Sequence, residues 1–445
     1  MATRKWLLAS SLLTFFALAG CTAPQDRTSP GAEGYYRETL RQLDAVQEEL
    51  PEITATASAA AKLYVEHDDL GLAADGMQAF FAEISGRSGG IMALGAWWPI
   101  QKPQWKGILL YCLQPGKLDD DLKRIATYNE RGSRVILFGT KEMLAAAKAA
   151  GAKCDAEVTI PAAPHLGLVE KADGQWVVGT YEIGAVATAW PWIAEFVAAC
   201  TREGKMPVMF QSIAVPTGMA RLEKYKLKEF KTGDYARWHD FKPLAVKEGD
   251  LSRQWLAACR WLLARLHGRE MKNIRLAAAR AAQAKQGGHA LWAIMNGHAP
   301  PYLAASPQDP HYFQDVTNQW ERYNASLAGK PPVPPVEKPA IRTGDFVLGM
   351  GYHSVFNEDA YHQFADYARS CGASAAWCAA TYRPEEIKIA PGEIFIDAQW
   401  QFGDAEVAVP GYDIKVFPAS GVVQCAVYGM IQAEMARIMA EKKGK

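Results

Sequence analysis

The feature that most constrains this chain is an order of apolar runs and turns that occurs twice. Residues 107–139 read as an apolar strand, a turn, a helix, a glycine and a second apolar strand. Residues 344–380 have the same order. Strands that are unbroken apolar runs and that alternate with helices are typical of a parallel sheet covered on both faces. The chain is therefore expected to hold two similar α/β units, because a solenoid would need a repeat of only tens of residues.

The pattern predicts the positions of most helices and strands. In the first half we expect strands at 70–74, 91–97, 107–113, 134–138 and 157–160, and helices at 36–66, 77–85, 118–130, 141–150 and 186–202. In the second half we expect helices at 251–286, 358–370 and 421–442, and strands at 289–295, 346–351, 373–380 and 394–398. Residues 216–249 are charged and irregular, and are expected to form a surface connector. Residues 330–338 are rich in proline and are expected to form a polyproline-like surface loop.

The two repeated stretches carry a resemblance to a known family. Each half resembles the sugar isomerase (SIS) fold, a flavodoxin-like parallel sheet that binds phosphosugars at the carboxyl ends of its strands. The family signature is a strand, a turn of the type S-x-S-G-x-T, a helix and G-x-x-V-I. Here the turn is Gln114-Pro115-Gly116-Lys117 in the first half and Tyr352-His353-Ser354-Val355 in the second. The architecture therefore matches in both halves, while both signature loops are degenerate.

The resemblance implies a fold class and a division of the chain. The fold class is α/β, with two tandem flavodoxin-like (SIS-type) three-layer αβα domains and parallel sheets. The first domain is expected at 34–215 and the second at 250–445, with 216–249 between them. Tandem SIS-like halves also occur in the isomerase part of glucosamine-6-phosphate synthase, so this arrangement has a precedent.

The first residues resemble a bacterial lipoprotein signal. Arg4 and Lys5 precede an apolar run at 6–18, which is too short to span a membrane comfortably. The run ends in Leu18-Ala19-Gly20-Cys21, which resembles a lipobox whose cysteine is lipidated. Residues 1–20 are therefore the expected signal peptide and 21–33 a flexible tether. An ordinary signal peptide or a short anchor helix is the alternative.

The resemblance also implies a location. In the lipoprotein pattern an Asp after the lipidated cysteine favours retention in the inner membrane, and this chain has Thr22 there. We therefore expect a protein of the cell envelope that is anchored through Cys21, at the periplasmic side of an outer membrane if the cell has one.

Charge and cysteine content exclude several classes of function. Lys plus Arg and Asp plus Glu are both 48, so the chain has no overall positive field that would attract nucleic acid. The seven cysteines other than Cys21 are widely and irregularly spaced, and no CxxC pair occurs. That pattern does not indicate a disulfide framework or a thiolate zinc site. The cysteines are expected to be mostly buried and to act as small apolar side chains.

The turn in the first half is a weak candidate for binding an anion. Pro115 removes one backbone N–H donor, although Gly116 and Lys117 can still serve an anion and Gln114 lies beside them. The adjacent Ser and Thr hydroxyls that would help to hold a phosphate at a helix N-terminus are absent. A standard phosphosugar site is therefore not expected in the first half.

The second half has more polar side chains at its expected strand ends. These ends converge on one crevice in an open parallel sheet, which is where such sheets bind ligands. The candidate ligand-binding residues are Asn296 and Gly297 after one strand, Tyr352 and Ser354 after the next, and Ser420, Gly421 and Gln424 at the start of the last helix. The plainer alternative is that these residues only cap helices, Ser420 being an ordinary N-cap.

Two histidines are candidates for acid–base chemistry. His298 and His353 follow the two strands of this crevice and suit proton transfer in an aldose–ketose isomerisation. Together with His311 and Asp397, these histidines are candidate metal ligands. No HxH or HxxxH spacing occurs, however, so no metal and no cofactor are expected. Glu83 and Arg87 lie four residues apart, which indicates either a surface ion pair on a helix or a pair that lines the cleft.

Three functions remain open from the sequence. The favoured one is binding of a carbohydrate derivative, either a sugar or a sugar phosphate, through the second domain. The alternative is a sugar or sugar phosphate isomerase, and the third is a structural lipoprotein that uses the fold as an interaction surface. The expected partners are a small carbohydrate derivative, the membrane through Cys21 and, as an open possibility, a second copy of the chain.

Overall fold

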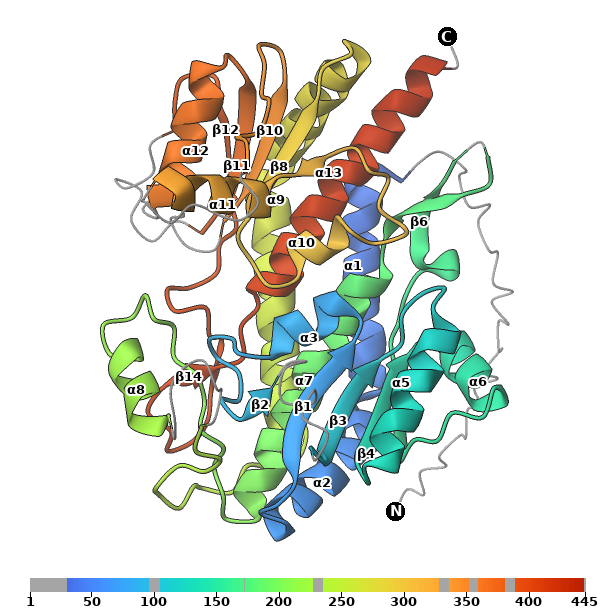
Figure 1. The fold of residues 1–445 in the computed structure, drawn as a ribbon, viewed down its shortest axis with the longest axis vertical. Helices are drawn as coiled ribbons and strands as arrows, with labels where there is room; N and C mark the ends of the chain where they lie inside the picture. Colours follow the sequence, from blue (N-terminus) through green and yellow to red (C-terminus); the bar gives the residue numbers. More distant parts are fainter. Residues whose placement is uncertain are drawn as a thin grey trace, which may run out of the picture.

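The computed structural model describes most of the chain beyond its first residues. It covers residues 30–95, 105–171, 173–226, 235–327, 336–351, 359–380 and 389–443. Figure 1 shows two sheets at opposite ends of the molecule, with long helices running between them. The expected signal peptide and Cys21 lie outside the described residues. The expected flexible tether at 21–33 ends too late, because α1 begins at Gly31 and both Gly31 and Ala32 are buried.

The first sheet has five parallel strands in the order β2-β1-β3-β4-β5. The strands are β1 (Gly71–Gly76), β2 (Leu94–Gly95), β3 (Gly107–Cys112), β4 (Arg134–Gly139) and β5 (Ala156–Thr159). The three central strands are nearly all buried, as expected for apolar runs with helices on both faces. Counted within this half, the order is 2-1-3-4-5, which is the flavodoxin-like order.

The second sheet has the same strand order. It contains β8 (Leu291–Met295), β9 (Gln314–Asp315), β10 (Phe346–Met350), β11 (Ser374–Ala379) and β12 (Ile394–Asp397). Its parallel strands are ordered β12-β11-β10-β8-β9, which again reads 2-1-3-4-5 when counted within this half. The expected fold class, with two flavodoxin-like parallel sheets, is therefore confirmed.

Helices cover both faces of each sheet. The outer helices are α5 (Leu118–Glu130) and α6 (Lys141–Ala149) on the first sheet, and α11 (Thr317–Leu327) and α12 (Asp359–Ser370) on the second. The inner helices are α1 (Gly31–Glu48), α2 (Leu50–Glu66), α3 (Gln78–Ile84), α7 (Tyr181–Arg202), α9 (Asp250–Gln286) and α13 (Ser420–Lys443). One continuous apolar core joins the inner helices to both sheets.

The inner helices tie the two halves together. The first helix, α1, packs against α9 and α13 of the second half as well as α7 of its own half, and α7 packs against α9. Figure 1 shows these four helices side by side between the sheets. Within the described residues α7 is the one helix with the length and hydropathy to cross a membrane, and its apolar stretch is entirely buried in the fold. That burial is typical of the core helix of a folded domain.

Smaller elements connect the main ones. They are the 3-10 helix η1 (Pro164–Leu166), the hairpin of β6 (Gly167–Glu170) and β7 (Trp176–Gly179), α8 (Gly218–Tyr225), α10 (Pro300–Leu303), and the antiparallel pair β13 (Val407–Ala408) and β14 (Lys415–Val416). The expectation that 216–249 is irregular is wrong for α8, whose Leu222 and Tyr225 pack against Met92 and Val208 in a small core of their own.

The cysteines behave as the sequence indicated. All seven in the described residues are free, and five of them are buried. Burial raises the pKa of the Cys259 and Cys425 thiols well above their usual range, which keeps both thiols protonated. These side chains act as small apolar groups of the core.

Candidate functional site

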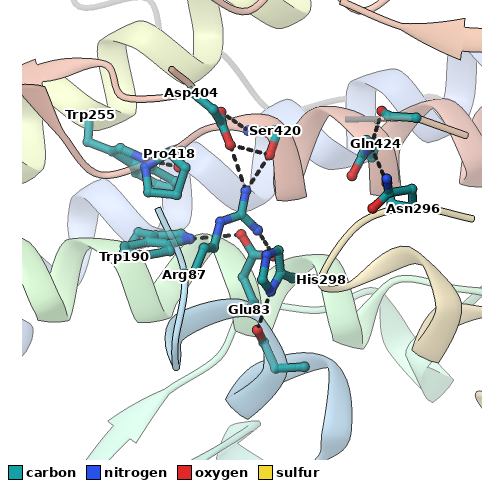
Figure 2. Close-up of polar contacts among 12 residues, drawn as sticks. Glu83, Arg87, Trp190, Trp255, Asn296, His298, Asp404, Pro418, Ser420 and Gln424 are labelled. Carbon is teal, nitrogen blue, oxygen red and sulfur yellow. Dashed lines mark hydrogen bonds and ion pairs between the residues drawn. The ribbon is translucent and has the colours of Figure 1, made fainter. Parts of the chain in front are cut away.

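The carboxyl ends of β8 and β10 meet at the point where the strand order of the second sheet reverses. Open α/β sheets bind ligands at such a point. Asn296 and Gly351 are the residues that directly follow these two strands. The first turns of α13 lie beside them, and contribute Ser420, Gly421 and Gln424 (Figure 2). Residues 296–298, Gly351 and 420–424 are called the second-sheet edge below.

Gln424 connects the two strand ends. Its Nε2 donates to the carbonyl oxygen of Asn296 at 3.2 Å and also to the carbonyl oxygen of Gly351. Its Oε1 is buried and has no hydrogen-bond partner among the described residues. Gly297 lies against this oxygen, since a Cβ at that position would come within 2.5 Å of it. The sequence therefore predicted correctly that Asn296, Gly297 and Gln424 lie close together.

The N-terminus of α13 is already bound by a carboxylate of the protein. Asp404 accepts a hydrogen bond from the Ser420 backbone N–H at 3.1 Å and from the Ser420 hydroxyl at 2.6 Å. A Cβ at Gly421 would overlap the carboxyl group of Glu83, so that second carboxyl also lies against this first turn. Negative groups are favourable at a helix N-terminus, and here the protein supplies them itself.

Arg87 connects the two carboxyls in a buried ion network, defined here as Glu83, Arg87, Asp404 and Ser420. Arg87 binds the Glu83 carboxylate, the Ser420 hydroxyl and, at 2.9 Å, Asp404 Oδ2 (Figure 2). All four side chains are at most 1% exposed. The Trp190 indole donates to Glu83 Oε1 at 3.1 Å. Glu83 and Arg87 thus form a buried contact between the halves, and the expectation of a surface ion pair is wrong.

Burial dominates the acid–base properties of the network. Removal of Glu83 from water raises its pKa to about 7, against the opposing effects of the Arg87 charge and the Trp190 hydrogen bond. Two carboxyls share one guanidinium here, and Asp404 raises the Glu83 pKa further. A proton on Glu83 would leave Arg87 and Asp404 as a balanced pair.

His298 joins the second-sheet edge to the first half. Its Nδ1 lies 3.0 Å from the carbonyl oxygen of Ala82 in α3. Desolvation of the imidazole and the nearby Arg87 charge lower the His298 pKa to about 3. The ring is therefore neutral at pH 7, so Nδ1 carries the proton and donates to Ala82. Asn296, Gly297 and His298 are each partly exposed, which leaves this part of the edge accessible.

The predicted turn of the first half lies on the other sheet. Gln114 is partly exposed, and Gly116 and Lys117 are exposed between β3 and α5. Asp121 in the first turn of α5 accepts from the Gln114 backbone N–H at 2.7 Å, from the Gln114 amide at 2.9 Å and from the Tyr111 hydroxyl at 2.8 Å. Burial raises the Asp121 pKa. With Asp119 and Asp120 in the same turn, this helix start presents carboxylates where a phosphate would have to bind.

Several sequence-predicted residues cannot be placed at the edge. Tyr352, His353 and Ser354 lie outside the described residues, so their predicted roles stay predictions. His311 is largely exposed, and its backbone N–H and ring both contact Asp309. No group of three or more possible metal-binding side chains occurs among the described residues.

Sequence reasoning missed Asp404 and the role of Trp190 as a donor. The spacing of Glu83 and Arg87 drew attention to that pair. Asp404 lies 317 residues from Arg87 in a loop with no motif, so no local signal identifies it. Trp190 is fully buried, and its sequence context gives no sign that its indole donates to Glu83.

Comparisons with known proteins add similar structures but no family. No family model and no curated protein matches this sequence. The tagatose-6-phosphate ketose/aldose isomerase from Escherichia coli aligns over 92% of this chain and 93% of its own, with a TM-score of 0.44 and 11% identity. The C-terminal domain of glucosamine-fructose-6-phosphate aminotransferase from Francisella tularensis aligns over 91% and 97%, with a TM-score of 0.44 and 9% identity.

TM-scores below 0.5 at this level of identity do not transfer an activity or a ligand. The fold class of this chain therefore rests on its own two sheets and their common strand order.

Proposed function

We propose that the protein binds an uncharged carbohydrate derivative at the second-sheet edge. The observation that carries this proposal is Gln424, a buried amide that holds both strand ends and keeps one acceptor oxygen without a hydrogen-bond partner among the described residues. A buried acceptor that lacks a donor costs free energy, so a hydroxyl donor at this position is favourable. Sugar hydroxyls are donors of that kind, and Asn296 and His298 are partly exposed beside it.

The carboxylates at the starts of α13 and α5 favour an uncharged ligand over a phosphosugar. A phosphate at the start of α13 would have to displace Asp404 from Ser420 and would meet Glu83 beside Gly421. In the first half, a phosphate beside Gly116 would meet the three carboxyls of the α5 first turn. Like charges close together are strongly unfavourable in a buried environment such as the start of α13, and less so at the exposed turn of the first half.

A sugar isomerase is the second candidate, and one observation favours it. Glu83 has a pKa of about 7, which is suitable for a general base at neutral pH. However, Arg87 and Trp190 occupy the Glu83 oxygens, and the side chain is wholly buried. His298 cannot act as a general acid near pH 7, because its pKa is about 3 and the ring is already neutral. These contacts favour binding over catalysis.

The test is thermal unfolding of the protein with glucose and N-acetylglucosamine, each compared with its own 6-phosphate at constant ionic strength. We expect a neutral sugar to raise the unfolding temperature and its 6-phosphate to raise it less. A ligand at 100 times its Kd stabilises the native state by about 2.7 kcal/mol. Asn296→Ala should reduce the shift, while Gln283→Ala, on the exposed face of α9, should leave it unchanged.

Two outcomes would contradict the proposal. One is a larger shift with the 6-phosphates than with the neutral sugars. The other is a shift that Asn296→Ala leaves intact. Interconversion of aldose and ketose, followed by NMR, would instead support the isomerase.

We also propose that the chain is exported and anchored through Cys21. The support is the order of basic residues, apolar run and Leu18-Ala19-Gly20-Cys21. Expressed in a bacterium, the wild-type protein should fractionate with membranes and carry fatty acid at Cys21 by mass spectrometry. Cys21→Ser should leave the membrane fraction, whereas Cys154→Ser, at a half-buried cysteine of the folded part, should not. Unmodified Cys21 in the wild-type protein would refute the anchor.

A further inference from the structure

One face of the long helix α9 stays at the surface and carries both basic and apolar side chains. This face is called the α9 stripe below, and it consists of Trp261, Arg265, Gly268, Arg269, Lys272 and Leu276. Neighbouring members are three or four residues apart, so they share one side of the helix. Arg265 is partly exposed and the other five are exposed. No residue of the second-sheet edge belongs to the stripe.

Two large apolar side chains of the stripe face solvent. Trp261 is 48% exposed and Leu276 is 41% exposed. Among the described residues, Trp261 is the one tryptophan that is exposed, because the others are buried or partly buried. The Arg265 guanidinium lies over the Trp261 ring, 4.4 Å from its centre. A tryptophan beside basic side chains is typical of a protein surface at the boundary between water and lipid.

The helix that carries the stripe is strongly basic. α9 has eight basic and two acidic side chains, although the whole chain has no formal net charge. Arg265 and Arg269 donate to the neutral amide oxygen of Gln399, at 2.8 Å and 3.4 Å. No carboxylate of the described residues forms an ion pair with these two arginines or with Lys272. The three positive charges therefore remain available to attract an anion.

The carboxylates near the stripe do not cancel its charge. Glu270 lies on the opposite side of the helix, since nine residues from Trp261 correspond to two and a half turns. Asp44 and Glu33 belong to α1, and they form ion pairs with Arg260 at 3.0 Å and Arg275 at 3.6 Å. Neither of these two basic residues is part of the stripe, so the α1 carboxylates are balanced outside it.

The proposed lipid anchor would connect to the fold close to this stripe. α1 begins at Gly31, and Glu33 and Tyr36 near its start both contact His267 of α9. Glu33 lies 2.9 Å from the imidazole, and the Tyr36 ring stacks on it with 4.3 Å between ring centres. Nine residues separate Cys21 from Gly31, and they can span at most about 30 Å. A bilayer that holds Cys21 would therefore be within reach of the middle of α9.

We propose that the α9 stripe lies on the surface of an anionic lipid bilayer, with its cations at the headgroup phosphates and Trp261 and Leu276 at the upper acyl chains. The exposed apolar side chains favour lipid over a polyanion in solution, which would need only the cations. A second copy of the chain would bring the same positive charges together, which is unfavourable. The contact orients the folded body on the membrane. The proposed anchor supports its location, but the binding itself depends neither on the anchor nor on the sugar site.

The test is flotation of the full chain with vesicles of phosphatidylglycerol and phosphatidylcholine in equal parts, compared with phosphatidylcholine alone, at low ionic strength. The chain carries Cys21→Ser, so no lipid anchor contributes, and residues 1–20 are the same in every variant. We expect Arg269→Gln with Lys272→Gln to weaken binding to the anionic vesicles on the order of 25-fold, about fivefold for each cation removed. The matched control is Lys123→Gln with Lys148→Gln, at exposed positions of α5 and α6, which should bind normally.

A second measurement reports contact with the acyl chains. Lipid that is brominated along its chains quenches the emission of a tryptophan that reaches it. We expect quenching of the chain on anionic vesicles, and we expect Trp261→Phe to reduce it while Trp190→Phe, at a fully buried ring, does not. Raised salt should release the protein, because the attraction is screened. Such weak and reversible binding is consistent with the loss of Cys21→Ser from a washed membrane fraction.

Each outcome decides the proposal. Binding that the α9 variant loses and the control variant keeps supports it. Normal binding by the α9 variant, equal loss in both variants, or no binding to either kind of vesicle refutes it. Binding of heparin without binding of vesicles would assign the stripe to a polyanion in solution, and a dimer that Trp261→Ala dissociates would assign it to a second copy. Both results also refute the proposal. Because the chain carries Cys21→Ser throughout, these results are separate from the presence or absence of lipid at Cys21.

Discussion

Gly421 allows α3 and α13 to meet. Its missing side chain leaves the space that the Glu83 carboxyl occupies, and a Cβ there would overlap that carboxyl. Glu83 cannot move aside easily, because Arg87 and Trp190 hold its two oxygens inside the core. Because Gly421 has no side chain, α3 and α13 can approach each other closely at this point.

Replacement of Gly421 by alanine should destabilise the protein. We expect Gly421→Ala to lower the free energy of unfolding by about 1–3 kcal/mol, as overpacking of a core does. Gly268→Ala is the matched control, because Gly268 lies on an exposed face of α9 and an added Cβ meets nothing within 4 Å. There, alanine should stabilise the helix by about 0.5–1 kcal/mol. Urea unfolding measures both, and an unchanged or raised stability for Gly421→Ala would contradict the structure.

The same residues show what the sequence can indicate about the site. The four-residue spacing of Glu83 and Arg87 identified them as a pair, yet α3 ends at Ile84 and Arg87 lies beyond it. The spacing therefore did not place both side chains on one helix face. Their burial depends on Asp404 and Ser420, which approach from the far end of the chain.

At the scale of elements, most of the fold could be predicted. The expected helix at 118–130 coincides with α5, and the expected strands at 107–113 and 346–351 differ from β3 and β10 only at their ends. These elements have strong apolar patterns and clear turns. The prediction started α7 at 186, five residues late. It therefore left the buried Glu182 outside the helix.

Weaker local patterns explain some of the elements that were missed, whereas α11 and the β6–β7 hairpin were also missed. α8 has eight residues with two basic and one acidic side chain, so its apolar positions do not stand out in a charged segment. β9, β13 and β14 have two residues each, which is too short for any periodicity. These elements form through contacts with distant segments, which a local pattern does not contain.

The start of α13 shows the same limit for the site. Small and hydroxyl residues at 420–421 were expected to present backbone N–H groups to an anion. The helix does begin at Ser420, but Asp404 from a preceding loop binds that N–H group. The group that binds this helix end is therefore a carboxylate of the same protein, and binding of a ligand there stays a prediction.

At the scale of the whole molecule, the two halves behave as one body around the ion network. The core is continuous from the first sheet to the second through α7, α9 and α13. Inside it, Arg87 is the cation that balances Glu83 and Asp404. Removal of one partner from a buried ion pair is strongly destabilising, because an uncompensated charge remains.

Arg87→Met should therefore destabilise the protein in a pH-dependent way. Glu83 has a native-state pKa of about 7 against an ordinary value of 4.5, so between these pH values the native state holds a proton that the unfolded state lacks. The contribution of Glu83 to stability is thus fully present below pH 4.5 and is lost as the pH rises through 7. In Arg87→Met that loss should be greater, because the guanidinium charge no longer offsets the two carboxylates.

We expect Arg87→Met to lower the free energy of unfolding by about 3–5 kcal/mol at pH 8 and by clearly less at pH 5. Urea unfolding at both pH values measures this difference. Arg253→Met is the control, since Arg253 is half exposed, pairs with Asp250 at the surface and should cost at most about 1 kcal/mol at either pH. If the loss for Arg87→Met were equal at pH 5 and pH 8, the carboxyls would not depend on Arg87 for their charge balance. The network would then join the halves by packing alone.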